Sequence, residues 1–378
     1  MNKTFTRYVW SLVFVSHNLG GNKMKKTKNV IDFYLKENVL KSNYEKFEKI
    51  GQIYYPLKTN SNEIVIKMLT ELYGNSKNGF LVSHISHYKK LVKLGVSPEK
   101  MCAINVITDD DTIKYFYNKG IRYFTFDNID SLKNFLKYAD SSKVKIAIRL
   151  NIFEVFGIFS HLGARTNDCY QMFDLLNQNN VENYGISFYL QKELLPKGDV
   201  LNVMLDYIKE KFKKYHFKFI NIGGAVKPDD IDINKLEEVK KSLKAEYIIL
   251  EPGRYLVGNA GYMETTIIKK QFNDTFIIKN GIYAGLLDSL LYHKKFDLYL
   301  KTDKLVKLKY EPFTNSKEIT ICGASSDSGD RIGKFYIDAD SYNQIEVGSK
   351  IIVDNALAYV EEFFMPLGGD LIKKYHII

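Results

Sequence analysis

The chain of 378 residues has few cysteines, and their spacing excludes two common stabilising devices. Cys102, Cys169 and Cys322 are odd in number, lie far apart and form no C-x-x-C pair, so neither a disulfide framework nor a zinc site is predicted. Such a chain suits a reducing compartment, and we expect it in the cytoplasm. His84 and His87 could share a helix face, but no third ligand is apparent nearby, so no metal is predicted.

The sequence also lacks a long hydrophobic run. The apolar stretch from Tyr8 to Val15 is short for a signal peptide and far too short to span a bilayer. We therefore expect no membrane partner, and we interpret residues 1–23 as a leader or upstream extension without fixed structure, with Met24 as an alternative start. The Walker loop, G-x-G-x-x-G and H-E-x-x-H motifs are missing as well.

Positive charge is in excess but is not concentrated anywhere. The formal net charge is +10, yet the lysines are scattered and no dense arginine-rich patch occurs. We attribute the charge to compositional bias and predict no nucleic-acid partner. With 45% hydrophobic and 26% charged residues, the chain has the composition of a folded protein that is long enough for two domains.

From residue 53 onward, short β-branched and aromatic runs alternate with segments of helical period. Apolar residues from Val65 to Leu72 recur at i, i+3, i+4 and i+7, and Asn60 and Glu63 have the spacing of a capping box at the start of that helix. The expected strands are residues 53–58, 80–82, 102–106, 123–127, 145–150, 184–190, 219–224 and 247–253. Eight strand–helix units predict an α/β fold, a parallel (β/α)₈ TIM barrel over residues 45–260.

The pattern changes after about residue 260. Runs over residues 263–272, 275–283, 304–310, 317–323, 331–338 and 350–360 are separated by Gly, Asn, Asp and Ser, with few helical stretches between them. Residues 261–378 are therefore predicted to form a separate, largely antiparallel β-domain. Residues 24–44, which contain the apolar run 29–35, are expected to join that domain.

Reactive residues of a barrel gather at the carboxyl ends of its strands, where the loops converge on one mouth. An amine next to Tyr54, Tyr55 and Pro56 would have a lowered pKa and could act as a Schiff-base nucleophile, although an ordinary strand-end lysine is the alternative. The residues at these strand ends are Lys58, Arg149, Tyr189, Gly223, Gly224, Glu251 and Arg254.

Two short motifs add to the lysine. In "NIGGA", residues 221–225, bare backbone N–H groups after a strand could approach a phosphate. In "EPGR", residues 251–254, a tight turn holds a carboxylate and a guanidinium at the same mouth, where Glu251 could keep a ring nitrogen protonated and Arg254 could meet a phosphate. Together with Lys58, these motifs outline a site for pyridoxal 5′-phosphate.

Eight segments, in order, carry a resemblance to a known family. They are "YYPLKTNSN", "GFLVSHISHYKKLVKLG", "YFTFDNIDSL", "GISFYL", "NIGGA", "EPGRYLVGNAG", "CGASSDSGD" and "DNALAY". From about Asn29 to the end, the chain resembles the fold-type III pyridoxal-phosphate decarboxylases, which include the ornithine, arginine and diaminopimelate decarboxylases. The resemblance implies an alanine racemase-like barrel followed by a β-domain, and this agrees with the fold predicted from periodicity.

The resemblance also implies roles for individual residues. Lys58 would bind the cofactor covalently, Glu251 would pair with the pyridine nitrogen, and Ser326 would take part in catalysis. The remaining cofactor-binding residues would be Arg149, Tyr189, Gly223, Gly224, Gly253, Arg254 and Tyr359. Asp327 and Tyr283 would bind substrate in the active site of the other subunit, because such enzymes form homodimers. Structural alternatives stay open, with Tyr359 as a core aromatic, Asp327 as a turn residue and Arg149 as part of an ion pair in the barrel.

The chain departs from the family pattern at several positions. Tyr189 stands where histidine is usual, and Ser326 replaces a catalytic cysteine, whose thiol is a much stronger acid than a hydroxyl. Lys58 or a water could therefore return the proton to the α-carbon. The other departures are Lys192 for serine, Ala225 for a third glycine, Phe80 for aspartate and Leu357 for glycine.

The predicted function is decarboxylation of a small α-amino carboxylate with a basic or modified side chain, a diaminopimelate- or ornithine-like substrate in a specialised biosynthetic pathway. "EPGRYLVGNAG" and "SSDSGD" look closest to diaminopimelate decarboxylases, but residues 281–298 lack the arginine expected to bind a second carboxylate. The alternatives are a diaminopimelate decarboxylase of lysine biosynthesis, a racemase and a non-catalytic regulatory relative.

Overall fold

The computed structural model describes residues 30–104, 109–190, 198–365, 367, 369 and 371–378. The predicted leader and Lys192 lie outside these ranges. Among the residues that are described, no helix combines the length and the hydropathy that crossing a bilayer requires.

Eight parallel strands close into a barrel, and the predicted TIM barrel is confirmed. Each strand pairs with the next, and the last one, β9, returns to the first one, β2. The strands are β2 (Gln52–Pro56), β3 (Gly79–Val82), β4 (Met101–Ile104), β5 (Tyr123–Phe126), β6 (Lys145–Arg149), β7 (Tyr184–Ser187), β8 (Phe219–Asn221) and β9 (Tyr247–Leu250). Three of the predicted strands, 184–190, 219–224 and 247–253, run past the ends of β7, β8 and β9, because the residues that follow each strand turn into the barrel mouth.

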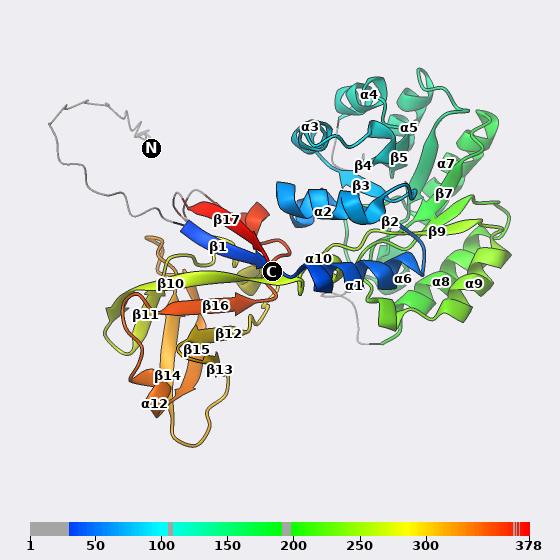
Figure 1. The fold of residues 1–378 in the computed structure, drawn as a ribbon. Coiled ribbons are helices and arrows are strands. Elements are labelled where there is room, and N and C mark those ends of the chain that lie inside the picture. The colour runs from blue at the N-terminus through cyan, green and yellow to red at the C-terminus, as the bar shows by residue number, and fades with distance from the viewer. Residues whose placement is uncertain (1–29, 105–108, 191–197, 366, 368, 370) are drawn as a thin grey trace, which may run out of the picture.

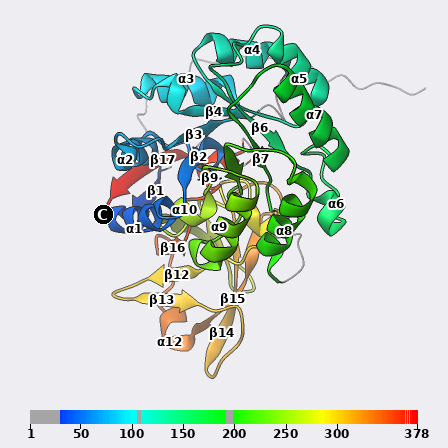
Figure 2. The same ribbon diagram turned by 90° about the vertical axis from the view of Figure 1, so that its right-hand side faces the viewer.

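Helices surround these strands on the outside of the barrel (Figure 2). They are α1 (Glu37–Glu48), α2 (Glu63–Tyr73), α3 (Ile85–Lys93), α4 (Asp110–Asn118), α5 (Ile129–Leu136), α6 (Phe153–Phe156), α7 (Thr166–Gln178), α8 (Val200–Phe212), α9 (Ile233–Ser242) and α10 (Arg254–Val257). Each of the longer helices buries one apolar stripe against the barrel, as their sequence period requires.

The start of α2 differs from the prediction. Asn62, not Asn60, is the N-cap, and its side-chain oxygen accepts a hydrogen bond from the Ile64 amide at 2.9 Å. The predicted capping box is wrong because Asn60 is used elsewhere: its side-chain amide donates to the carbonyl of Leu357 at 2.8 Å. Local sequence rules make the two asparagines equally good N-caps, and the tertiary contact of Asn60 leaves Asn62 as the cap.

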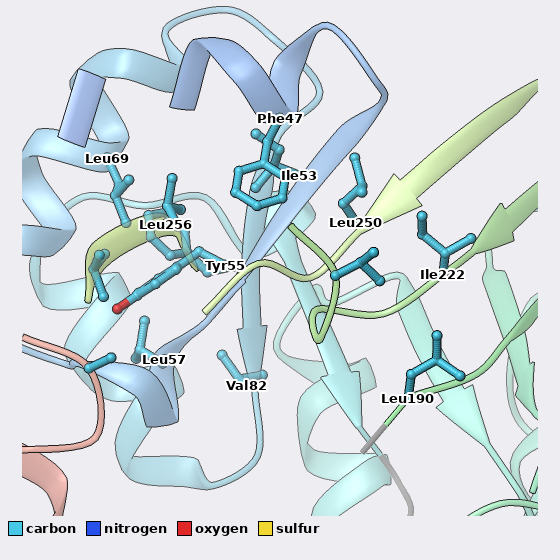
Figure 3. Close-up of a cluster of buried hydrophobic side chains, with 14 of the residues drawn as sticks. Phe47, Ile53, Tyr55, Leu57, Leu69, Val82, Leu190, Ile222, Leu250 and Leu256 are labelled. Atoms are coloured by element: carbon cyan, nitrogen blue, oxygen red, sulfur yellow. The ribbon is translucent and has the colours of Figure 1, made fainter. Parts of the chain in front are cut away.

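The two faces of the barrel strands build separate layers. Outward-facing side chains pack beneath the helices, where Phe47 of α1, Leu69 of α2 and Leu256 of α10 gather with Ile53 and Tyr55 of β2 (Figure 3). The side chains that fill the inside of the barrel form a second cluster of Tyr54, Leu81, Cys102, Tyr123, Ala147, Phe219 and Ile249.

Phe80 belongs to the outer layer. Its ring centroid lies 5.3 Å from that of Tyr73 of α2 and 6.4 Å from that of Tyr55. Phe80, which stands where the family often has aspartate, thus packs outside the barrel, because alternate side chains of a strand point to opposite faces and it is Leu81 that points inward.

A sheet of nine strands forms the second part of the protein and lies to one side of the barrel (Figure 1). Seven of its strands lie in the spatial order β13-β12-β16-β10-β11-β14-β15, and neighbours are antiparallel except β11 and β14. The remaining two strands extend from β10: β1 pairs antiparallel with β10 and parallel with β17. The bounds are β1 (Val30–Leu35), β10 (Gly261–Gln271), β11 (Thr275–Ile278), β12 (Leu298–Lys301), β13 (Leu305–Leu308), β14 (Ser316–Cys322), β15 (Arg331–Asp338), β16 (Lys350–Asp354) and β17 (Ile372–Ile377), with short helices α11 (Asp288–Leu291) and α12 (Ala339–Tyr342). The strands β12 and β17 were not predicted, because neither has a clear alternation of apolar and polar residues.

At the opposite end of the barrel from the mouth, one lysine lies among aromatic rings. The ammonium nitrogen of Lys145, the first residue of β6, is 4.2 Å from the ring centroid of Tyr123, 4.7 Å from that of Phe219, 5.0 Å from that of Tyr247 and 5.1 Å from that of Tyr54. Burial lowers the pKa of Lys145 to about 7.

This burial predicts a pH dependence of stability. Between pH 7 and about 10, the unfolded chain keeps a proton on Lys145 that the folded chain has lost, so the free energy of unfolding should rise with pH by up to about 1.4 kcal/mol per unit. Lys145→Met removes this contribution, and its unfolding free energy, measured by urea titration at pH 7.5 and 9.5, should rise less than that of the wild type. Lys133→Met, which changes an exposed lysine of α5, is the control. Equal pH dependence in Lys145→Met and the wild type would contradict the prediction.

Candidate active site

A cavity of about 590 Å³ opens at the carboxyl ends of the barrel strands. The structure brings to its wall most of the residues that the sequence predicts for the site: Lys58, Arg149, Tyr189, Gly224, Glu251, Gly253, Arg254 and Tyr359. Gly223 lies directly behind this wall, where its carbonyl accepts a hydrogen bond from the amide of Glu251 at 2.9 Å. Its φ of +70° is a conformation that glycine adopts without strain.

Lys58 lies on a turn rather than at the end of a strand. β2 ends at Pro56, which has no N–H for the sheet ladder, and residues Leu57–Thr59 form one turn of 3₁₀ helix. Burial lowers the pKa of Lys58, the positive charge of Arg149 lowers it further, and the negative charge of Glu251 opposes both. The amine is therefore neutral, and nucleophilic, at a lower pH than an ordinary lysine.

Glu251 is held in place by an asparagine that the sequence analysis missed. The side-chain amide of Asn221 donates to Glu251 Oε1 at 2.7 Å, and the Asn221 Oδ1 accepts from the Gly223 amide at 2.9 Å. Burial raises the pKa of Glu251, and Asn221, Arg149 and Lys58 oppose the rise. A half-buried carboxylate on the wall of an open cavity favours a ligand that presents a positively charged N–H group. The position of Asn221, at the end of an apolar strand and two residues before a pair of glycines, was the available signal.

Arg254 is oriented by two neighbours. Its Nη1 lies 2.6 Å from Oδ2 of Asp288, and its guanidinium carbon lies 4.9 Å from the ring centroid of Tyr359. Asp288, at the start of α11, lines the same cavity and is only 2% exposed. Its Oδ1 is buried without a hydrogen-bond partner among the described residues. Asp288 was not predicted from the sequence, although it is the only charged residue between Ala284 and Tyr292.

Glycines keep the floor of the cavity free of side chains. A Cβ atom added to Gly253 would lie 2.3 Å from the hydroxyl of Thr59, and one added to Gly224 would lie 1.8 Å from the carbonyl oxygen of Glu251. The Thr59 hydroxyl is buried and lacks a partner among the residues described. Because Gly224 and Gly253 have no side chains, backbone atoms and the Thr59 hydroxyl occupy the space that a Cβ atom would need.

Arg149 and Tyr189 form one wall of the cavity. The Arg149 guanidinium carbon lies 5.8 Å from the Tyr189 ring centroid. Burial lowers the pKa of Arg149, while Glu251 and Asp127 oppose that change. One oxygen of Asp127 already accepts a hydrogen bond from the Gly163 amide at 2.7 Å.

Three predicted residues lie elsewhere. Ser326, Asp327 and Tyr283 belong to the second sheet's loops and are not part of the wall around Lys58. The Tyr283 hydroxyl donates to Asp327 at 2.9 Å. Asp330, which is buried, joins the two loops by accepting hydrogen bonds from the amides of Ile282 at 2.7 Å and Ser325 at 3.2 Å.

Comparison with known proteins links these features to a family. A sequence family described as "Pyridoxal-dependent decarboxylase, pyridoxal binding domain" matches residues 37–258. The ornithine decarboxylase of Schizosaccharomyces pombe is 23% identical over 326 residues, which are 82% of this chain and 73% of that protein. The diaminopimelate decarboxylase of Campylobacter jejuni is 21% identical over 355 residues, 86% of this chain and 84% of that protein.

A solved structure shares the fold over almost the whole chain. The arginine decarboxylase of Paramecium bursaria Chlorella virus superposes with a TM-score of 0.76 at 17% identity, and the match covers 93% of this chain and 97% of that one.

Proposed function

The chain belongs to the pyridoxal-dependent decarboxylase family, and we propose that it removes the α-carboxylate, as CO₂, from an amino acid whose side chain ends in a positive charge. It is a pyridoxal phosphate-dependent amino acid decarboxylase, and what we propose in addition is the class of its substrate. The observation that carries it is Asp288, a buried carboxylate on the wall of the Lys58 cavity.

The residues of the cavity fit pyridoxal phosphate. Lys58 offers an amine for the aldehyde, Glu251 a carboxylate for the ring nitrogen, and Arg254 a guanidinium for the phosphate. The bare backbone at Gly224 and Gly253, which line the cavity, would supply further donors to the phosphate oxygens. Tyr189 could pack its ring against the cofactor.

The chemistry divides between the cofactor and the chain. When bound, pyridoxal phosphate supplies a sink for the electron pair that the departing CO₂ leaves behind. Glu251, desolvated and held by Asn221, would keep a proton on the pyridine nitrogen. Lys58 would hold the cofactor, yield to the substrate amine and then release the product, and its lowered pKa makes the neutral amine available for both exchanges.

The return of a proton to the α-carbon would fall to Lys58 or Ser326. Lys58 lines the cavity, whereas Ser326 is exposed on the second sheet of its own chain. A hydroxyl is a much weaker acid than the thiol that this family often uses, so we favour Lys58 Nζ as the donor, with Ser326 as a hydrogen-bonding group.

The substrate proposal follows from charge. With Glu251 assigned to the ring nitrogen and Arg254 to the phosphate, Asp288 retains a buried oxygen without a donor among the described residues. An ammonium or guanidinium group on the substrate would provide that donor, whereas a second carboxylate would be repelled. Asp288 therefore favours a basic amino acid as substrate, and diaminopimelate is the alternative.

We also propose a homodimer in which Asp327, Tyr283 and Ser326 complete the site of the partner subunit. Ser326 and Asp327 are exposed and Tyr283 is half-buried, and the absence of all three from their own chain's cavity wall supports this arrangement. Asp330 would hold the loop that carries them at a fixed position on the second sheet.

The role of Lys58 is tested by Lys58→Ala. Release of CO₂ from a panel of diamino acids and their conjugates is measured by mass spectrometry. We expect its rate to fall by about 10²- to 10⁴-fold, because the chain loses both its cofactor anchor and its proton donor. The visible absorbance of the bound cofactor should disappear as well. Lys133→Ala serves as the control, and turnover retained in Lys58→Ala would refute the assignment.

The role of Asp288 is tested by Asp288→Asn, which keeps the shape of the side chain and removes its charge. The KM for a basic amino acid should rise about 10- to 100-fold, the cost of losing a charge-assisted hydrogen bond. Because Asp288 also contacts Arg254, cofactor affinity must be measured separately by absorbance titration. An unchanged KM in protein saturated with cofactor would show that Asp288 does not recognise the substrate's charge.

The shared site is tested by mixing two inactive variants. Lys58→Ala and Asp327→Ala homodimers should each have little activity, and their mixture after subunit exchange should recover about one quarter of the wild-type activity. Half of the dimers would then be mixed, and each mixed dimer would carry one intact site. No recovery, with exchange verified by mass spectrometry, would place both residues in the same subunit's site.

A further inference from the structure

The turn that carries Lys58 is tied to the last part of the chain. The amide of Tyr359 donates to the carbonyl of Thr59 at 2.7 Å, and the amide of Ser61 donates to the carboxylate of Glu362 at 3.0 Å. Between them, the side-chain amide of Asn60 donates to the carbonyl of Leu357 at 2.8 Å. The last residue of this turn and the two residues that follow it are thus held by a segment about 300 positions away in the sequence.

Asn60 uses all of its side-chain and carbonyl groups in this arrangement. Its amide nitrogen also donates to the hydroxyl of Tyr375 at 3.1 Å, and its Oδ1 accepts from the Asn62 amide at 3.0 Å. The carbonyl of Asn60 accepts from the Tyr55 hydroxyl at 3.1 Å. Asn60 is fully buried, so rotation of this residue would leave several polar groups without partners in a region that water does not reach.

Tyr375 is itself rigidly placed. Its ring stacks on that of Phe33 with centroids 4.9 Å apart, and its hydroxyl donates to Oε2 of Glu361 at 2.7 Å. Burial and the nearby Glu361 carboxylate raise the pKa of Tyr375 well above its ordinary value, so the hydroxyl keeps its proton. Tyr375 lies in β17, which pairs with β1 along the register Val30↔Ile372 to Leu35↔Ile377, where the first and last described strands run side by side (Figure 1).

We propose that Tyr375 is a positioning residue for Lys58: its hydroxyl, held by Glu361, fixes Asn60 and thereby the turn that aims the Lys58 amine into the cavity. The inference rests on the proposed role of Lys58 as the cofactor lysine. β17 then holds the turn at the barrel mouth in addition to completing a sheet, because β17 is itself held by β1, which pairs with β10. A loosened turn would leave the amine in the cavity but spread it over more orientations, which slows a reaction that needs close alignment.

The test is Tyr375→Phe, which keeps the ring on Phe33 and removes only the hydroxyl. The rate at which apoprotein captures pyridoxal phosphate, followed by visible absorbance, should fall about 3- to 10-fold, and kcat should fall by a similar factor while the substrate KM stays the same. Tyr34→Phe is the matched control, since Tyr34 lies on β1 and stacks on Tyr262, with centroids 4.7 Å apart, on the other face of the same strand pair. It should leave both rates unchanged.

Three outcomes decide the matter. Equal rates of cofactor capture in Tyr375→Phe and Tyr34→Phe would overturn the proposal. A loss of thermal stability shared by both variants, without a slower capture that is limited to Tyr375→Phe, would also overturn it. If Tyr375→Phe does not fold, Glu361→Gln replaces it, because that change weakens the hold on the hydroxyl while the tyrosine stays, and the capture rate should again fall. Wild-type protein that captures no cofactor would instead refute the proposed function of Lys58.

Discussion

The structure depends on how charged groups are brought together at the mouth of the barrel, around one cavity. Lys58, Arg149 and Glu251 lie close enough to shift one another's pKa values, and burial opposes the charged form of all three. The wall of the same cavity carries cationic and acidic side chains in equal number, with Arg254 added to the first two and Asp288 and Glu362 added to Glu251. The helices that surround the barrel and the cluster that fills its interior make this desolvation possible, so the fold and the chemistry of the mouth cannot be separated.

A second set of contacts surrounds these charges and comes from the other half of the chain. Asp288 of α11 pairs with Arg254, and Tyr359 packs under the same guanidinium. Asn60 is bound by Leu357 and Tyr375. The barrel therefore carries Lys58, Arg149 and Glu251, whereas the second part of the chain holds Asn60 and Arg254 in place.

Much of this could be predicted from the order of residues, because the physics is local. Alternating strand and helix periods specify a barrel, and the rule that reactive groups sit at the carboxyl ends of parallel strands selects Lys58, Glu251 and Arg254. Consecutive glycines after a strand mark a close backbone approach, and Gly224 has no room for a Cβ atom. The resemblance to the decarboxylases rests on the same positions.

Other features could not be predicted, because they depend on contacts between distant segments. Asn60 and Asn62 are equally good caps in sequence, and only the carbonyl of Leu357 and the hydroxyl of Tyr375 assign Asn60 to another task. Asp288 sits in an apolar run that has no period to show which way it faces. The sequence by itself determined the barrel and which side chains come together at its mouth, since periodicity and strand ends are encoded locally. Only the tertiary structure decided the partners that orient those groups, since hydrogen bonds and ion pairs across hundreds of residues exist only once both sheets are formed.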